Sequence, residues 1–117
     1  MPRAKKRILC ISYDESLLTT RKLLFERAGF DVVPAFGFTE ASTICRNDPM
    51  FDLIVMGHSI PQADKIALVG LLRPNCTAPI LSIRRAFEPS FQEADFSVSS
   101  TDGPEALIEA ARNALKK

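Results

Sequence analysis

The feature that most constrains the fold of this chain is a regular alternation of short apolar runs with longer amphipathic segments. Runs of four to six residues rich in apolar side chains fit buried strands, and the segments between them repeat their apolar residues at helical spacing. The expected strands are 8–11, 30–35, 52–57, 79–83 and 96–99. The expected helices are 15–28, 39–46, 64–73 and 104–116. This alternation predicts a parallel sheet with helices on both faces.

Local signals support the expected ends of these elements. Gly29 stands where a helix C-cap is expected, Thr39 is a candidate N-cap, and Pro104 fits the first turn of the last helix. Pro34 places the second strand at an edge of the sheet or at a strand end. Right-handed crossovers favour a doubly wound α/β sheet of five strands in the order 2-1-3-4-5. In such folds, ligands bind beyond the carboxyl ends of the strands.

Length and charge bound the class of protein. The 117 residues suit a single domain over 1–117, with residues 1–6 as a basic and flexible N-terminus that serves solubility. The net charge of +1 argues against a general attraction to nucleic acid or to an anionic membrane. The sequence has neither an apolar stretch near 18 residues nor a signal peptide, so we expect a soluble, cytoplasmic protein.

The three cysteines, Cys10, Cys45 and Cys76, are odd in number and widely spaced, and no CxxC motif is present. This pattern fits a reducing cytoplasm and argues against a disulfide framework or a zinc site. Cys10 lies inside an apolar run, where a thiol usually behaves as a small core side chain. We expect neither a metal nor another cofactor.

Five segments carry a family resemblance: 8–18, 28–33, 51–61, 79–81 and 103–107. Together they resemble the receiver domains of bacterial response regulators, the CheY-like domains of two-component signal transduction and the phosphorelay. The likeness spans almost the whole chain in order and spacing. It implies the flavodoxin-like fold that the periodicity predicts, and a cytoplasmic signalling role.

Receivers use two acidic residues after strand one and an aspartate after strand three to hold Mg²⁺, and the last of these accepts a phosphoryl group. A hard divalent cation needs carboxylate oxygens, and the charge of the phosphoryl group must be neutralised. The matching positions here are Ser12, Tyr13 and Gly57. The resemblance therefore implies that the acceptor aspartate is replaced by Gly57 and that no residue at this position is phosphorylated.

Receivers also carry a serine or threonine after strand four and a lysine after strand five, both of which hold the phosphoryl oxygens. The matching positions are Arg84 and either Ser99 or Ser100, depending on a one-residue choice of alignment. All five functional positions thus depart from the family pattern. The resemblance is to a degenerate pseudo-receiver with no catalytic residue, no phospho-acceptor and no metal ligand.

Neighbouring residues offer few substitutes. Asp14 is one carboxylate without a partner, which is a weak Mg²⁺ site, and its position suits a helix N-terminal acid. His58, the sole histidine, suggests a phosphohistidine, but a lone histidine with no acidic partner in sequence is more typical of a loop. Tyr13, the only tyrosine, is a candidate to fill the emptied space beside Gly57.

Two arginines are candidates for anion contact. Arg84 and Arg85, with the Ser99–Ser100–Thr101 loop, could hold an anion, or Arg84 could occupy the space that the metal leaves. Both interpretations stay open.

The segment between strands four and five is shorter than in receivers. Phe96 follows Arg84 by only twelve positions, and Pro89 interrupts this segment, so we expect a fourth receiver helix of one or two turns at 89–94. The corresponding surface of receivers carries dimerisation and output. Phe87, Phe91 and Phe96 cluster here, and they serve either core packing or, if exposed, a partner surface.

These observations favour a non-enzymatic signalling module that recognises another signalling protein without phosphorylation. One alternative is a receiver that accepts a phosphoryl group on a non-standard residue. Another is a small anion-binding sensor at Arg84 and Arg85. A homodimer also stays open, and the identity of the partner is not written in the sequence.

Overall fold

The structure, a computed structural model, describes residues 5–47, 50–86, 88 and 92–116. Five parallel strands form one sheet in the order β2-β1-β3-β4-β5. The strands are β1 (Arg7–Ser12), β2 (Asp31–Phe36), β3 (Leu53–Met56), β4 (Ile80–Arg84) and β5 (Phe96–Ser99). The helices are α1 (Glu15–Arg27), α2 (Phe38–Asn47), α3 (Gln62–Leu72) and α4 (Pro104–Leu115). The predicted fold class and strand order are confirmed.

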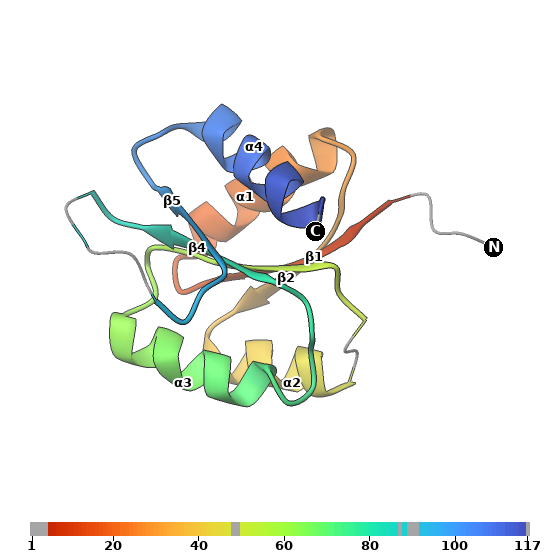
Figure 1. Cartoon of the computed structure of the whole chain (residues 1–117), viewed down its shortest axis with the longest axis vertical. Coiled ribbons are helices and arrows are strands. Elements are labelled where there is room, and N and C mark those ends of the chain that lie inside the picture. The colour runs from red at the N-terminus through yellow and green to blue at the C-terminus, as the bar shows by residue number, and fades with distance from the viewer. Residues whose placement is uncertain (1–4, 48–49, 87, 89–91, 117) are drawn as a thin grey trace.

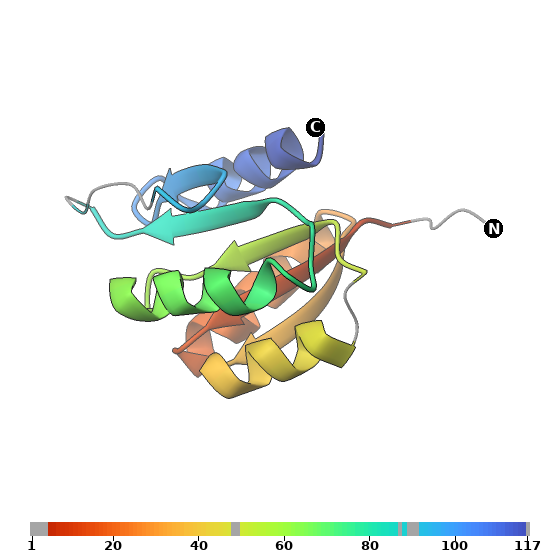
Figure 2. The same ribbon diagram turned by 60° about the horizontal axis from the view of Figure 1, so that its bottom comes forward.

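The helices form two layers on opposite faces of the sheet. Figure 1 shows α1 and α4 above the sheet and α2 and α3 below it, and Figure 2 shows the second pair from another side. Successive residues of β1 serve opposite layers: Ile8 and Cys10 pack under α1 and α4, whereas Leu9 and Ile11 pack under α2 and α3. Each fully buried aliphatic side chain contributes about 1.5–3 kcal/mol, so burial on both faces drives the fold.

The helix ends follow most of the predicted signals. The side chain of Asp14 accepts a hydrogen bond from the backbone N–H of Leu17, at 3.0 Å, as the cap of α1. Gly29 has a φ of 99°, the left-handed conformation that favours glycine after a helix. The prediction of Thr39 as an N-cap is wrong, because α2 already begins at Phe38.

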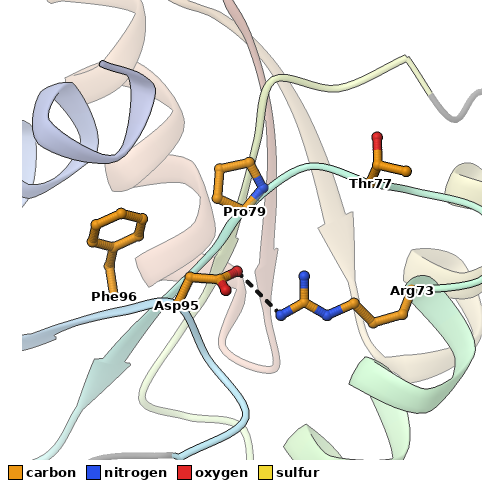
Figure 3. Close-up of a pocket in the computed structure, with 5 residues that line it drawn as sticks. All are labelled: Arg73, Thr77, Pro79, Asp95 and Phe96. Carbon is orange, nitrogen blue, oxygen red and sulfur yellow. Dashed lines mark hydrogen bonds and ion pairs between the residues drawn. The ribbon is translucent and has the colours of Figure 1, made fainter. Parts of the chain in front are cut away.

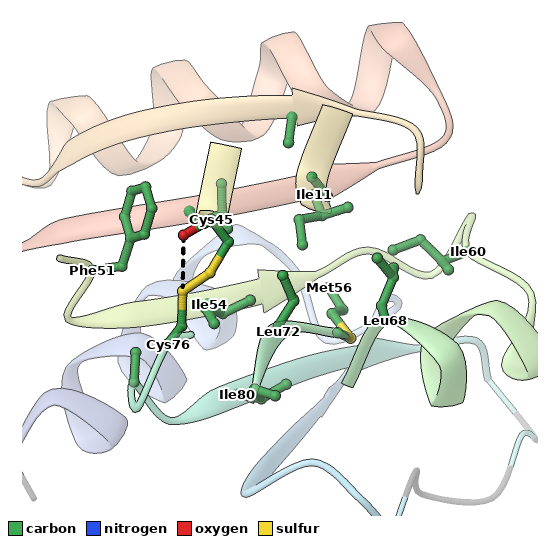
Figure 4. Close-up of a cluster of buried hydrophobic side chains, with 14 residues drawn as sticks. Ile11, Cys45, Phe51, Ile54, Met56, Ile60, Leu68, Leu72, Cys76 and Ile80 are labelled. Atoms are coloured by element: carbon green, nitrogen blue, oxygen red, sulfur yellow. Dashed lines mark hydrogen bonds between the residues drawn. A yellow bond between two sulfur atoms is a disulfide. The ribbon is translucent and has the colours of Figure 1, made fainter. Parts of the chain in front are cut away.

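A disulfide joins Cys45, near the end of α2, to Cys76, in the turn after α3 (Figure 4). The prediction that the cysteines form no disulfide is therefore wrong. The two residues are 31 positions apart in sequence, and the topology brings their Cα atoms to 6.6 Å because α2 and α3 cover the same face of the sheet. Cys10 stays a buried thiol, as expected, and burial raises its pKa to about 12.

The connection from β4 to β5 is short, as the sequence predicts. Its described residues, 85–86, 88 and 92–95, form turns and bends and no helix. Part of the predicted helix at 89–94 lies outside the described residues, as do Phe87 and Phe91. Phe96 packs, half-buried, against the core under α4, which is the packing role the sequence allowed for it.

Two further observations concern the surface of the fold. Arg7 belongs to β1, and its guanidinium lies 4.8 Å from the centroid of the Phe51 ring, in a cation–π contact. Within the described part of the chain, every helix is too short or too polar to cross a membrane.

Candidate functional site

The carboxyl ends of β1, β3, β4 and β5 meet along one edge of the sheet, here called the carboxyl edge. The backbone N–H of Gly57 donates to the carbonyl of Ile11, at 2.9 Å, and the N–H of Ser100 donates to the carbonyl of Arg84, at 2.7 Å. Arg84 also pairs in register with Ser99. The residues predicted to form the degenerate pocket are thus brought to a common edge.

Ser12 organises the loop after β1. Its buried hydroxyl lies 3.1 Å from the Ser59 hydroxyl, 2.9 Å from the carbonyl of Asp14 and 3.0 Å from the N–H of Asp14. The Ser59 oxygen in turn accepts a hydrogen bond from the N–H of Tyr13, at 2.9 Å. The two hydroxyls therefore tie the loop after β1 to the loop after β3.

Tyr13 reaches across to α3 and not toward Gly57. Its hydroxyl donates to Oδ2 of Asp64, at 2.8 Å. Burial of the phenol, together with the hydrogen bond and the negative charge of Asp64, raises the pKa of Tyr13 to about 12. The prediction that Tyr13 fills the space beside Gly57 is therefore wrong, and another residue lies there.

That residue is Arg21, on the buried side of α1. A Cβ atom built on Gly57 would lie 2.8 Å from Nη1 of Arg21, closer than non-bonded atoms approach one another. Arg21 is only 7% exposed. A cationic guanidinium therefore lies where an acidic side chain at position 57 would begin.

His58 connects Arg21 to the loop after β4. Nη2 of Arg21 lies 2.8 Å from Nδ1 of His58, and Nε of Arg85 donates to the carbonyl of His58, at 3.2 Å. Since a guanidinium can only donate, Nδ1 accepts and the proton of the neutral ring lies on Nε2. Burial lowers the pKa of His58, and the charges of Arg21, Arg85 and Lys65 lower it further.

Lys65 is a second buried cation, on α3, and is 1% exposed. Its Nζ donates to the Ser82 hydroxyl, at 2.9 Å, and to the carbonyl of Ile83, at 3.0 Å, both on β4. Burial lowers the pKa of Lys65. The ammonium group is thus held by two oxygens of the strand on which α3 packs.

Sequence reasoning missed both Arg21 and Lys65, although a signal was present. Arg21 falls on the buried stripe of α1 between Leu18 and Phe25, at helical spacings of three and four residues. Lys65 begins the buried stripe of α3. A charged residue within an apolar stripe marks a buried cation that needs partners.

The two arginines predicted to contact an anion differ in exposure. Arg84 is half-buried and donates from Nη1 to the carbonyl of Glu88, at 3.4 Å, whereas Arg85 is exposed. The N–H of Arg85 also donates to a carboxylate oxygen of Glu88, at 3.3 Å. These contacts hold the start of the β4–β5 connection.

The loop after β5 closes on itself. The hydroxyl of Ser99 lies 2.9 Å from that of Thr101, and the N–H of Ser99 donates to Oδ2 of Asp102, at 3.3 Å. The side chains of Ser99 and Thr101 are therefore engaged with one another.

A cavity of about 450 Å³ lies at the opposite end of the sheet, near the start of β4 and β5 (Figure 3). Within it, Nη2 of Arg73 pairs with Oδ2 of Asp95, at 3.1 Å. The same carboxylate oxygen accepts the N–H of Ile80, at 2.8 Å. This ion pair stabilises the start of β4 and β5, at the end of the sheet opposite the carboxyl edge.

Comparison with known proteins identifies the fold. No protein-family model and no curated protein matches the sequence. A receiver domain protein from Clostridium thermocellum superposes with a TM-score of 0.82 at 17% identity, covering 95% of this chain and 94% of that one. One from Methanospirillum hungatei gives 0.80 at 20% identity, covering 96% and 94%. One from Methylobacillus flagellatus gives 0.78 at 18% identity, covering 94% and 98%. The chain has the fold of response-regulator receiver domains.

The carboxyl edge does not fit the Mg²⁺ that receivers bind. Two carboxylates near this edge have other partners, since Asp14 caps α1 and Asp64 accepts from Tyr13. The guanidinium of Arg21 lies against Gly57, and a cation repels a metal ion. Across the part of the chain that the structure describes, no three side chains of the metal-ligating types come together. A magnesium ion requires negatively charged oxygen ligands, whereas this edge presents the positively charged N–H donors of Arg21.

Proposed function

We propose that this chain, over residues 1–117, is a pseudo-receiver: a receiver-like signalling module that catalyses no reaction and acts by binding another signalling protein. Its recognition of that partner does not depend on phosphorylation of the carboxyl edge. The proposal combines the receiver fold with the replacement of the five functional positions.

The observation that carries the proposal is the guanidinium of Arg21 beside Gly57. In a receiver, this place belongs to the acceptor carboxylate and its metal. Here, the side chain at position 57 is absent and a buried cation approaches the vacated position to 2.8 Å. The change is one of charge sign as well as of residue type, so restoration of one carboxylate does not restore the site.

Phosphoryl transfer to a non-standard residue is the alternative, and His58 is its candidate. Nδ1 of His58 accepts a hydrogen bond from Arg21, and burial, followed by the charges of three nearby cations, lowers the pKa of the ring. A neutral ring could still present Nε2 to a donor. Whether His58 accepts a phosphoryl group is therefore decided by a direct measurement.

The test is incubation with acetyl phosphate and Mg²⁺, followed by intact mass spectrometry. We expect no gain of one phosphoryl group in the wild type and none in Gly57→Asp, whose new carboxylate would pair with Arg21. A genuine receiver domain serves as the positive control for the reagent. A stoichiometric phosphoryl adduct on the wild type would overturn the proposal.

Partner binding calls for a separate experiment. Helix α3 exposes Ile66 by 50% and Leu71 by 43%. A partner captured by the wild type and by Gly57→Asp, but lost with Ile66→Glu and Leu71→Glu, would support recognition through this face. A partner whose capture requires a phosphodonor would contradict phosphorylation-independent binding.

A further inference from the structure

The hydrogen bond between Arg21 and His58 requires one protonation state of the imidazole. Nη2 of Arg21 lies 2.8 Å from Nδ1 of His58, and a guanidinium has donors but no acceptor. Nδ1 must therefore be an unprotonated acceptor, which is possible only in the neutral ring. In the doubly protonated ring, an N–H of the imidazole would face an N–H of the guanidinium. The contact is thus compatible with the neutral state of His58 and incompatible with the charged state.

The buried guanidinium of Arg21 depends on this hydrogen bond. The residue is 7% exposed, and its Nη1 is buried without a hydrogen-bond partner among the described residues. Hydrogen bonds to charged groups are among the stronger ones in proteins, and a buried charge that loses its partner is unfavourable. Protonation of His58 removes the acceptor of Nη2 and also places a like charge beside it. The protonated ring therefore favours separation of the two side chains.

Three cations and one carboxylate act on the ring of His58, and they come from α1, α3, the loop after β4 and the loop before α1: Arg21, Lys65, Arg85 and Asp14. Burial lowers the pKa of His58 from its usual value of 6.5, and the three cations lower it further. Asp14 acts in the opposite direction, and its charge acts on Arg21 as well. Two further carboxylates face other groups, since Glu88 accepts the N–H of Arg85 and Asp64 accepts the hydroxyl of Tyr13. The charged ring therefore forms only at acidic pH.

His58 lies in a loop that connects three parts of the carboxyl edge. Its carbonyl accepts a hydrogen bond from Nε of Arg85, at 3.2 Å, and its ring contacts Arg21 on α1. The hydroxyl of the next residue, Ser59, accepts the N–H of Tyr13, at 2.9 Å. A change in the position of the ring can therefore reach the loops after β1 and β4.

We propose that the contact between Arg21 and His58 is a pH-sensitive switch: a proton that binds Nδ1 of His58 breaks the contact and releases residues 57–59 from α1. The proton comes from the solvent, and no covalent bond other than the new N–H is made or broken. The inference goes beyond the proposed function, because it requires neither a partner protein nor a phosphoryl group. It gives the carboxyl edge, where receivers accept a phosphoryl group, a conformational response to protonation.

The experiment follows isotope-labelled protein by NMR from about pH 7.5 to about pH 4.5, a range that includes the usual pKa of histidine. The imidazole signals give the pKa of His58 directly, because the chain has one histidine. We expect the amides of Gly57, Ser59 and Tyr13 to shift with the same midpoint as the ring. The amide of Cys76, at the opposite end of the sheet, should not follow that midpoint.

Two variants imitate the two states of the ring. His58→Gln supplies an amide oxygen that accepts from Arg21 at every pH, so the histidine-dependent shifts of Ser59 and Tyr13 should disappear. His58→Lys places a permanent positive charge beside Arg21, so Tyr13 at neutral pH should resemble the acidified wild type. At one common pH, hydrogen exchange of the Tyr13 amide should be about tenfold faster in His58→Lys than in His58→Gln, because the loop opens more often.

Asp14→Asn tests the assignment of charges around the ring. Asparagine keeps a side-chain oxygen to cap α1 but removes the carboxylate that favours the charged ring. The pKa of His58 should therefore fall in this variant. A rise would contradict the assignment of charges on which the switch rests.

Several results would overturn the inference. One is an imidazole that titrates while the amides of Ser59 and Tyr13 stay unchanged, and another is an imidazole that remains neutral throughout the range. Shifts with the histidine midpoint that persist in His58→Gln, or equal Tyr13 exchange in His58→Gln and His58→Lys, would do the same. If His58→Lys fails to fold, the titrations of the wild type and of His58→Gln still decide the outcome.

Discussion

Among the residues that the structure describes, each face of the sheet buries one cation, and the two cations are hydrogen-bonded differently. On the α2–α3 face, Lys65 donates to two oxygens of β4, and the disulfide ties α2 to the turn after α3. On the α1–α4 face, Arg21 has one hydrogen-bonded nitrogen and lies beside a cavity. Lys65 is thus held by two oxygens, whereas one buried nitrogen of the Arg21 guanidinium has no hydrogen-bond partner.

The difference separates a cation held by two oxygens from one that is incompletely hydrogen-bonded. A buried ammonium with two oxygen partners has two of its three donors satisfied, and its removal leaves those oxygens without a partner. The Arg21 guanidinium has one hydrogen bond, to His58, and one buried nitrogen without a partner, so we expect a smaller net contribution to the fold. Burial of a charge alone therefore does not reveal its role, and the completeness of its hydrogen bonding does.

The largest expected effect concerns the disulfide on the α2–α3 face. The double variant Cys45→Ser and Cys76→Ser should lose about 3–4 kcal/mol of the free energy of unfolding, since the bridge closes a long loop in the unfolded chain. Urea denaturation of the oxidised wild type and of the variant measures the loss. Cys10→Ser changes a buried thiol outside the bridge and is the control for a polar hydroxyl in the core. A loss below about 1 kcal/mol would mean that the bridge does not stabilise this face.

The second prediction compares the loss of stability when each of the two buried cations is replaced by methionine. Lys65→Met should destabilise the fold by about 1–3 kcal/mol, because the Ser82 hydroxyl and the Ile83 carbonyl lose their partner. Arg21→Met should change stability by less than about 1 kcal/mol or raise it, since an apolar side chain replaces an incompletely paired charge. Urea unfolding at neutral pH compares both with the wild type. Equal losses for the two variants would remove the distinction between the faces.

The third prediction uses Tyr13, whose phenolate absorbance is unobscured because the chain has one tyrosine and no tryptophan. The folded protein should titrate with a pKa of about 12 and the urea-unfolded protein near 10. Because the folded pKa is the higher one, stability should fall as pH rises from 10 toward 12. Asp64→Asn should lower the folded value, and a folded midpoint near 10 would contradict the Tyr13–Asp64 contact.

The smallest expected effect is the titration of His58. Its pKa should lie below 6.5, first because of burial and then because of Arg21, Arg85 and Lys65. The unfolded chain then binds the proton more readily, so stability is full above pH 6.5 and falls as the pH drops through the folded pKa. NMR of the single imidazole measures the value, and Arg21→Met should raise it. A pKa at or above 6.5 in the wild type would show that the cations do not converge on this ring.

The fold and the positions of the strand ends could be predicted from the sequence. The side chains that fill the space between the strand ends could not. Apolar periodicity and family spacing located Ser12, Gly57 and Arg84, because strand ends are local features. Arg21 comes from a helix 36 residues before Gly57, and the contact between them depends on the packing of α1 against the sheet. The Cys45–Cys76 bridge was missed for the same reason, since it joins elements of one layer that are distant in sequence.

The strand order also bears on how the protein behaves at high concentration. An exposed strand edge is a template for pairing with another chain, and the two edges here are β2 and β5. Pro34 lies within β2 and lacks the N–H that a continuing ladder requires, while β5 offers only four residues. Both edges therefore disfavour strand addition and the aggregation that follows from it. A second copy of this chain, if one binds, has helical and loop surfaces to use in place of a continuous intermolecular sheet.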